Sequence, residues 1–196
     1  MLLTIDVGNT QTVVGLYRAG PGRGDDPGAP GTPSSGADDA DLLDHWRIST
    51  DADRTSDELA MVLRQLLDSA EDELDEEITL HGIAISSGVP FVTAELRQMC
   101  EHRFGIAPVV VGPGVKTGLP IRYDNPAEVG ADRVANAVGA LDRYGGPTVV
   151  VDFGTATTFD VIADGPTYVG GAIAPGIGVS VRALVDRAAR LSSVDL

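Results

Sequence analysis

The chain has 196 residues, of which 43% are hydrophobic, enough to bury the core of one domain or of two small ones. A formal net charge of -15 opposes nonspecific attraction to nucleic acid and to anionic membranes, so we expect neither as a partner. The single cysteine, Cys100, cannot form a disulfide within the chain, and with only three histidines beside it a zinc cluster is not expected. The first residues lack a basic region followed by a long apolar stretch, which predicts a cytoplasmic location.

The first predicted hairpin carries a cluster of small polar residues in its turn. The sequence TIDVGNTQT, residues 4–12, lies between two apolar runs. Gly and Asn readily adopt positive φ, so a plain hairpin turn would explain Gly8 and Asn9. A phosphate-binding turn would explain them too, because Gly8 lets the backbone approach an anion while Asn9, Thr10 and Thr12 offer hydrogen-bond donors. This stretch alone leaves both interpretations open.

Residues 18–41 differ in composition from the rest of the chain. Of these 24 residues, 10 are Gly or Pro, and large apolar side chains are nearly absent. Ordering such a segment would cost more conformational entropy than its little buried surface could offset, which predicts a flexible insertion. It joins predicted strands at residues 12–17 and 44–50, and we expect that shortening it would leave function elsewhere intact.

A helix is predicted next, followed by a strand, a helix and a strand. Thr55 and Glu58 have the spacing of a capping box, and an apolar face follows at helical spacing. That face comprises Leu59, Val62, Leu63, Leu66, Leu67 and Ala70. The later elements are predicted at residues 82–87, 91–104 and 106–112. The first lobe therefore reads as three strands, helix, strand, helix, strand.

The pattern of the first turn returns in the second part of the chain. Residues 149–162, VVVDFGTATTFDVI, again give an apolar strand, Asp, any residue, Gly, a Thr-rich turn and a second apolar strand. A third strand at 167–177 and a helix at 178–191 complete the repeat. Two such lobes could hold a polyphosphate between their turns. Asp6 and Asp152 would then point at the nucleotide, where carboxylates repel phosphate unless a metal cation lies between them.

These residues resemble the superfamily of actin, Hsp70 and the sugar kinases, with DVGNT like its first phosphate motif and DFGTATT like its second. The resemblance narrows to the type III pantothenate kinases through GPGVKTGLPIRYDNPAEVGADRVANAVGA at 112–140, together with ISSGVP and VGGAIAPGI. It implies an α/β fold of duplicated ribonuclease H-like, actin-like ATPase lobes (βββαβαβ), with residues 1–145 as the first lobe and 146–196 as the second.

The second lobe is expected to be truncated. Only 44 residues follow Asp152, enough for three strands and one helix, whereas the first lobe has two further strands and another helix. A half-built parallel sheet exposes an edge and an apolar helix face, which predicts poor solubility or reliance on a partner chain.

The resemblance implies ATP-dependent phosphorylation of pantothenate to 4'-phosphopantothenate, the first step of coenzyme A biosynthesis, by a homodimer. The alternatives are a catalytically silent relative with a regulatory or binding role, and an inactive fragment. A third is a different acceptor, such as a sugar, although Tyr123 and Arg133 favour a carboxylated substrate.

The resemblance also implies roles for individual residues. Asp132 would be the catalytic proton acceptor, and Arg133 would pair with the substrate carboxylate. The implied pantothenate-binding residues are Tyr123, Gly130, Ala131, Asp132 and Arg133. The implied ATP-binding residues are Asp6, Val7, Gly8, Asn9, Thr10, Gln11, Thr12, Val13 and Thr155. Asp6 would orient Mg²⁺, and Asp152 would bind K⁺ or NH₄⁺.

Structural explanations remain open for several of these residues. Asp132 could be a helix-capping residue with Arg133 solvated, and Tyr123 could be a buried structural tyrosine. The segment GGAIAPG at 170–176 could be a strand-to-helix turn or a loop beside the nucleotide. Many family members carry a Thr near Ala188 that reaches the neighbouring subunit's substrate, so that contact is expected to be missing here.

Overall fold

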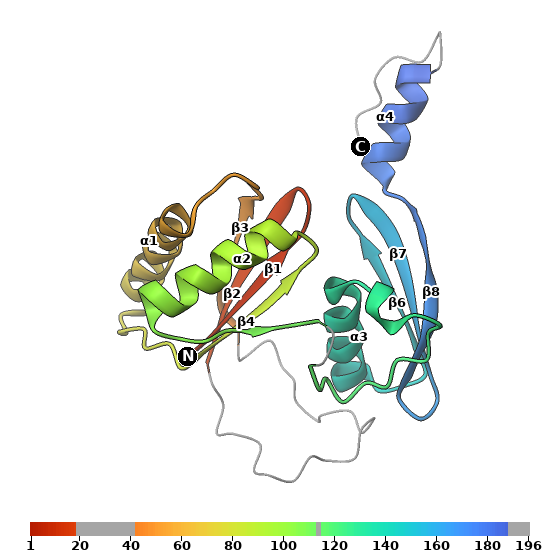
Figure 1. Ribbon diagram of the computed structural model, residues 1–196, viewed down its shortest axis with the longest axis horizontal. Helices are drawn as coiled ribbons and strands as arrows, with labels where there is room; N and C mark the ends of the chain where they lie inside the picture. The colour runs from red at the N-terminus through yellow and green to blue at the C-terminus, as the bar shows by residue number, and fades with distance from the viewer. Residues whose placement is uncertain (19–41, 113–114, 188–196) are drawn as a thin grey trace. The chain divides into compact units, whose positions relative to one another are not determined.

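The computed structural model describes residues 1–18, 42–112 and 115–187 (Figure 1), so the predictions made for residues 19–41 and for Ala188 lie outside the described residues. The chain divides into two compact units. The described residues of the first unit are 1–18, 42–112, 115 and 127–135, and those of the second are 116–126 and 136–187. The predicted lobe boundary between residues 145 and 146 stays a prediction.

The first unit is built on a mixed five-stranded sheet with the strand order β3-β2-β1-β4-β5. Its strands are β1 (Leu2–Val7), β2 (Gln11–Tyr17), β3 (Leu42–Ser49), β4 (Gly82–Ser87) and β5 (Val109–Val110). Its helices are α1 (Ser56–Leu74) and α2 (Pro90–Met99), the latter continued by a π-helical turn, Cys100–Phe104. The predicted order of elements is confirmed, although β5 is shorter than the strand expected at 106–112.

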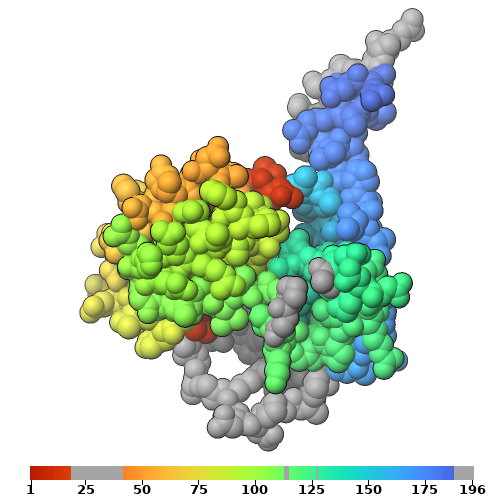
Figure 2. Space-filling view, viewed as in Figure 1, coloured from red at the N-terminus to blue at the C-terminus, as the bar shows by residue number. Residues whose placement is uncertain are grey.

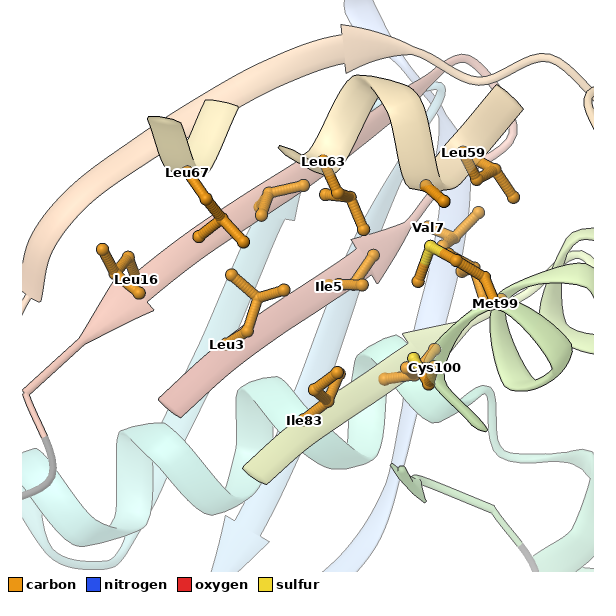
Figure 3. Close-up of a cluster of buried hydrophobic side chains, with 14 of the residues drawn as sticks. Leu3, Ile5, Val7, Leu16, Leu59, Leu63, Leu67, Ile83, Met99 and Cys100 are labelled. Atoms are coloured by element: carbon orange, nitrogen blue, oxygen red, sulfur yellow. The ribbon is translucent and has the colours of Figure 1, made fainter. Parts of the chain in front are cut away.

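Strand β1 shows how the sequence builds the core of this unit. Its alternate residues Leu3, Ile5 and Val7 are 0%, 2% and 2% exposed, because they face the apolar stripe of α1 (Figure 3). That stripe includes Leu59, Leu63 and Leu67. In the space-filling view, α1 and α2 form most of the visible surface of the first unit (Figure 2). The face of β1 that carries Asp6 is the opposite one.

Helix α1 begins with the predicted capping box. The Glu58 N–H donates to Thr55 Oγ1 at 3.4 Å, and the Thr55 N–H donates to Glu58 Oε2 at 2.8 Å. Hydrogen bonds from the Thr55 backbone and hydroxyl lower the pKa of the Glu58 carboxyl. The cap fixes where α1 starts, six residues after Thr50.

Cys100 lies fully buried in the core beneath α2, and burial, reinforced by the charge of Glu101, raises the pKa of its thiol from 9.0 to about 11. Between these values the unfolded chain ionises at Cys100 and the native chain does not. We therefore expect the free energy of unfolding to fall as the pH rises from about 9 to about 11, by roughly 2 kcal/mol at pH 10.5. Urea unfolding at pH 8 and 10.5 measures this loss. The Cys100→Ala variant is the control, and an equal loss in that variant would show that other groups cause it.

The second unit has a three-stranded antiparallel sheet with the order β6-β7-β8. Its elements are β6 (Thr148–Phe153), β7 (Ala156–Ala163), β8 (Thr167–Pro175) and α4 (Ile177–Arg187). Helix α3 (Ala131–Tyr144) precedes them, after a 3-10 turn at Pro126–Glu128, and contributes its residues from 136 onward to this unit. The predicted order of three strands and a helix is confirmed. Of the segment 170–176, residues 170–175 are part of β8 and Gly176 joins β8 to α4, so most of the segment is strand and not a loop beside the nucleotide.

The two sheets bury equivalent strands to different degrees. Asp6 and Asp152 occupy the same place in their motifs, so Leu3, Ile5 and Val7 correspond to Val149, Val151 and Phe153. The latter are 57%, 41% and 69% exposed, and β6 is an edge strand among the described residues, whereas β1 pairs with β4. Among the described residues β6 therefore exposes an edge and an apolar strand face, although the sheet is antiparallel and not the half-built parallel sheet that was expected. None of the helices in the described stretches is long and apolar enough to cross a lipid bilayer.

Candidate active site

The first predicted phosphate turn joins β1 to β2 in an antiparallel hairpin with Val7 paired to Thr12. The Gly8 N–H donates to the Gln11 carbonyl at 3.0 Å, which closes the turn. Neither Gly8 nor Asn9 has a positive φ, so the hairpin interpretation is right about the connection and wrong about its backbone conformation. A Cβ at Gly8 would lie 3.1 Å from the Gln11 carbonyl oxygen. Gly8 is therefore needed for close packing within the turn.

Thr50, which follows β3, holds this turn through hydrogen bonds. Its hydroxyl donates to the Gly8 carbonyl at 2.7 Å, and its N–H donates to the Thr10 carbonyl at 3.0 Å. Its hydroxyl also lies 2.8 Å from Thr12 Oγ1. Protein donors thus occupy carbonyl oxygens that would otherwise repel a phosphate. In the sequence, Thr50 is only the last residue of the strand predicted at 44–50, and its contacts with the first turn were not predicted.

We expect Thr50→Val to weaken nucleotide binding more than it lowers stability. The substitution keeps the volume and the backbone N–H but removes the hydroxyl that holds the Gly8 carbonyl. Loss of one neutral hydrogen bond costs about 0.5–1.5 kcal/mol, so the dissociation constant for ATP should rise about 3- to 10-fold. Calorimetric titration with ATP measures it. Thr79→Val, in the loop before β4, is the comparison, and equal effects of both variants would contradict a specific role for Thr50.

The second turn joins β6 to β7 and is one residue shorter than the first. Phe153 pairs with Thr157 across residues 154–156, whereas residues 8–11 separate the corresponding pair in the first turn. The Gly154 N–H donates to the Ala156 carbonyl at 2.9 Å. Thr155, the predicted nucleotide contact, is exposed at the tip.

Gly176, between β8 and α4, packs its backbone against this second turn. Its N–H donates to the Thr155 carbonyl at 3.0 Å. A Cβ at Gly176 would lie 2.8 Å from the Thr155 carbonyl carbon and would also clash with the carbonyl oxygen of Gly154. Only glycine therefore fits here, for reasons of space rather than of φ. The residue before α4 is therefore hydrogen-bonded to the second turn and packed closely against it.

The predicted catalytic residue Asp132 lies in the first turn of α3. Its Oδ1 accepts a hydrogen bond from the Arg133 N–H at 2.8 Å, and the carboxylate leans over Gly130, where a Cβ would clash with it. The Gly130 carbonyl accepts the helical bond from the Val134 N–H at 3.1 Å. Asp132 is the second residue of α3 and accepts from the adjacent N–H, so it is not the N-cap that the capping interpretation expected. Its side chain is nonetheless exposed.

Tyr123 is 45% exposed, so the interpretation as a buried structural tyrosine is wrong. Its segment is held along β8, because the Arg122 N–H donates to the Tyr168 carbonyl at 2.8 Å and the Tyr168 N–H donates to the Pro120 carbonyl at 2.9 Å. The Tyr123 ring lies over Gly170, whose φ is +129° at a bulge in β8.

The buried tyrosine of this unit is Tyr168. It is 1% exposed, and its hydroxyl donates to Asp160 Oδ1 at 2.7 Å. A carboxylate and a phenol buried together anchor β8 to β7 beneath the segment that carries Tyr123. The sequence placed both residues in predicted strands but gave no sign that their side chains pair.

Comparison with known proteins decides the family. A family model described as type III pantothenate kinase matches residues 2–196. The chain belongs to the type III pantothenate kinase family. A type III pantothenate kinase of Streptomyces avermitilis is 51% identical over 199 residues, and one of Koribacter versatilis is 48% identical over 196. Each match covers 100% of this chain and 67% of the relative.

A solved structure supports the fold. A conserved protein of Campylobacter jejuni, described as belonging to the Baf family of transcriptional activators, superposes with a TM-score of 0.52 at 17% sequence identity. The alignment covers 97% of this chain and 62% of that protein. The expected α/β fold and the kinase family are thus confirmed. The chain spans about two thirds of the length of the type III pantothenate kinases it matches.

The two candidate metal-binding aspartates suit ions that need few protein ligands. Asp6 lies near the end of β1 and Asp152 near the end of β6, and both side chains are exposed. Across the described parts of the chain, no three His, Cys, Asp or Glu side chains are grouped to bind a metal ion. Mg²⁺ keeps several waters and is commonly bound through one or two carboxylates together with nucleotide phosphates, so Asp6 alone fits that role.

The structure groups the predicted residues into local sets. The first set, residues 6–13, lies in and beside the β1–β2 turn. The second set, residues 130–133, lies at the start of α3. The third set is Thr155, whose carbonyl accepts the Gly176 N–H. Tyr123 belongs to the second unit, whereas the start of α3 belongs to the first. Their joint action on one substrate is therefore part of the proposal that follows.

Proposed function

We propose that the chain transfers the γ-phosphoryl group of ATP to the primary hydroxyl of pantothenate, giving 4'-phosphopantothenate. The observation that carries the proposal is the arrangement at the start of α3, in a chain of this family. Asp132 is exposed, its Oδ1 is oriented by the Arg133 N–H, and its carboxylate lies over a residue with no side chain. A carboxylate held in this way can accept the proton of an approaching hydroxyl.

The two hairpin turns are proposed to hold the ATP phosphates. In each, a backbone carbonyl at the tip is occupied by a protein donor, from Thr50 in the first turn and Gly176 in the second. That arrangement lowers the repulsion between the turns and a polyanion. Mg²⁺ held by Asp6 and K⁺ or NH₄⁺ held by Asp152 would supply positive charge against the phosphates.

Asp132 is proposed to orient the acceptor hydroxyl and to take its proton late in the transfer. An ordinary carboxylate is a weak base, but phosphoryl transfer through a loose transition state depends chiefly on position and electrostatic stabilisation. Gly130 is needed because a side chain there would displace the Asp132 carboxylate. Arg133 is proposed to pair with the pantothenate carboxylate and Tyr123 to line the same pocket.

An acceptor panel tests the substrate. ADP release is measured with ATP and Mg²⁺ in potassium buffer, using pantothenate, its analogue with a hydroxymethyl group in place of the carboxylate, and glucose. We expect release with pantothenate, a fall in kcat/KM of about 10-fold or more with the uncharged analogue, and none with glucose. Equal rates with pantothenate and the uncharged analogue would contradict the role of Arg133. Activity only with glucose would contradict the proposed substrate.

We propose that the chain works as a homodimer in the cytoplasm. Sedimentation equilibrium measures its oligomeric state directly.

The alternative function is that of a regulatory relative that binds the same ligands without turnover. Such a protein would bind ATP and pantothenate in calorimetry yet release no ADP.

A further inference from the structure

Asp152 has a polar neighbour on α3 whose role the proposed function leaves unassigned. Asn136 Nδ2 donates to Asp152 Oδ2 at 3.1 Å. Asn136 lies four residues after Asp132, so the two side chains project from the same face of α3, one turn apart. A hydrogen bond to one carboxylate oxygen fixes the rotation of the group and leaves the other oxygen for a ligand.

A second polar neighbour lies on β7. Thr158 is the residue directly opposite Asp152 in the β6–β7 register, and residues paired in this way share one face of a sheet. The Thr158 hydroxyl oxygen is buried and has no hydrogen-bond partner among the described residues. Leaving a buried hydroxyl unsatisfied costs about 1–3 kcal/mol, so the group requires an explanation.

The first lobe shows that the hairpin itself does not need this hydroxyl. Asp6 is the counterpart of Asp152, and the residue opposite Asp6 on β2 is Val13. An apolar side chain therefore serves at the equivalent place in the same kind of hairpin. Within the two hairpins the hydroxyl therefore occurs only beside Asp152, because the buried hydroxyl beside Asp6 belongs to Ser86 on β4, outside the β1–β2 hairpin.

We propose that Asn136 and Thr158 complete the monovalent-cation site at Asp152. Asn136 is a positioning residue that orients the carboxylate, and the Thr158 hydroxyl supplies a second, uncharged protein oxygen. This inference rests on the proposed function, because that proposal assigns the cation to Asp152. One carboxylate beside neutral oxygens carries a single negative charge, which matches a singly charged ion.

Thr158→Val tests the inference, because it removes the hydroxyl and keeps the shape of the side chain. The melting temperature of the whole chain is followed with saturating Mg²⁺ and ATP while KCl replaces choline chloride at constant ionic strength. Without potassium we expect the variant to melt at the wild-type temperature or above it, since an unsatisfied buried hydroxyl is gone. The potassium concentration for half-maximal stabilisation should rise about 10-fold or more.

Asn136→Ala should raise the same midpoint by about 10-fold, since changes to groups that orient a metal ligand typically weaken binding by 10- to 100-fold. Ser86→Ala is the matched control. Ser86 lies opposite Asp6 on β4, and its hydroxyl is likewise buried without a hydrogen-bond partner among the residues described. We expect Ser86→Ala to leave the potassium midpoint unchanged, because Ser86 lies beside the other aspartate.

The outcomes separate this inference from the proposed function. Wild-type midpoints in Thr158→Val and Asn136→Ala would overturn the inference, as would a wild-type chain whose melting temperature does not respond to potassium. Either result could accompany formation of phosphopantothenate, which would leave the proposed function standing. A potassium response that both substitutions weaken, in a chain that forms no product, would support the cation site and contradict the proposed activity.

Discussion

Replacing Asp132 with Asn is expected to lower the turnover number by about 10²- to 10⁴-fold, the range typical for loss of a positioned general base. Asn keeps the size of the side chain and an oxygen that can accept the Arg133 N–H, so α3 should begin as before. What it loses is the ability to take the proton of the acceptor hydroxyl. ATP binding should therefore change little while turnover collapses.

Steady-state kinetics of phosphopantothenate formation measure this effect, with calorimetry for ATP binding alongside. Asp142→Asn is the matched control, since Asp142 is exposed near the other end of the same helix. We expect that variant to turn over at close to the wild-type rate. If Asp132→Asn stayed within a few-fold of wild type, Asp132 would not be the base.

Replacing Gly176 with Ala should disrupt the second phosphate turn. The added methyl group would lie 2.8 Å from the Thr155 carbonyl carbon and against the carbonyl oxygen of Gly154, so backbone must move. Overpacking of this kind costs about 1–3 kcal/mol of stability. A displacement of about 1 Å in a positioning element can lower kcat/KM for ATP by about 10²-fold. Thermal melting and ATP-dependent kinetics measure the two effects.

Gly178→Ala provides the control for this substitution. Gly178 lies two residues further along, in α4, and a Cβ there would meet nothing within 4 Å. Alanine favours a helix over glycine by about 1 kcal/mol, so this variant should melt at or above the wild-type temperature with unchanged kinetics. Equal losses in both variants would show that α4 tolerates no alanine, and would contradict a specific contact between Gly176 and the turn.

The elements of the fold were predictable because their signals are local. The alternation of buried and exposed side chains along β1 and the capping box of α1 each involve only residues close in sequence, and both are present in the structure. The repeated Asp-x-Gly turn predicted the second set of strands in the right order. Strand β5 was overestimated because an apolar run does not reveal how many of its residues find a partner strand.

The supporting contacts of the candidate site were not predictable, because they join segments far apart in sequence. Thr50 reaches the Gly8 turn from the end of β3, and Gly176 meets the Gly154 turn from the end of β8. No local pattern distinguishes Thr50 from another threonine at a strand end. Gly176 carried a weak signal, as a glycine between a predicted strand and a predicted helix, but the need for it comes from a neighbour more than twenty residues away.

The buried pair of the second unit shows a different limit. Asp160 lies in an apolar stretch, where an aspartate is usually read as solvent-facing. Its partner Tyr168 is eight residues away, and only the antiparallel register of β7 and β8 brings the two together.

The measurement that tests the central claim most directly is product formation by the 196-residue chain with ATP, Mg²⁺ and pantothenate, in potassium and then in sodium buffer. Phosphopantothenate is detected by mass. We predict product in potassium and little or none in sodium, abolished in Asp132→Asn. No product from a chain that melts cooperatively and binds ATP would contradict the proposal that this chain is a working pantothenate kinase.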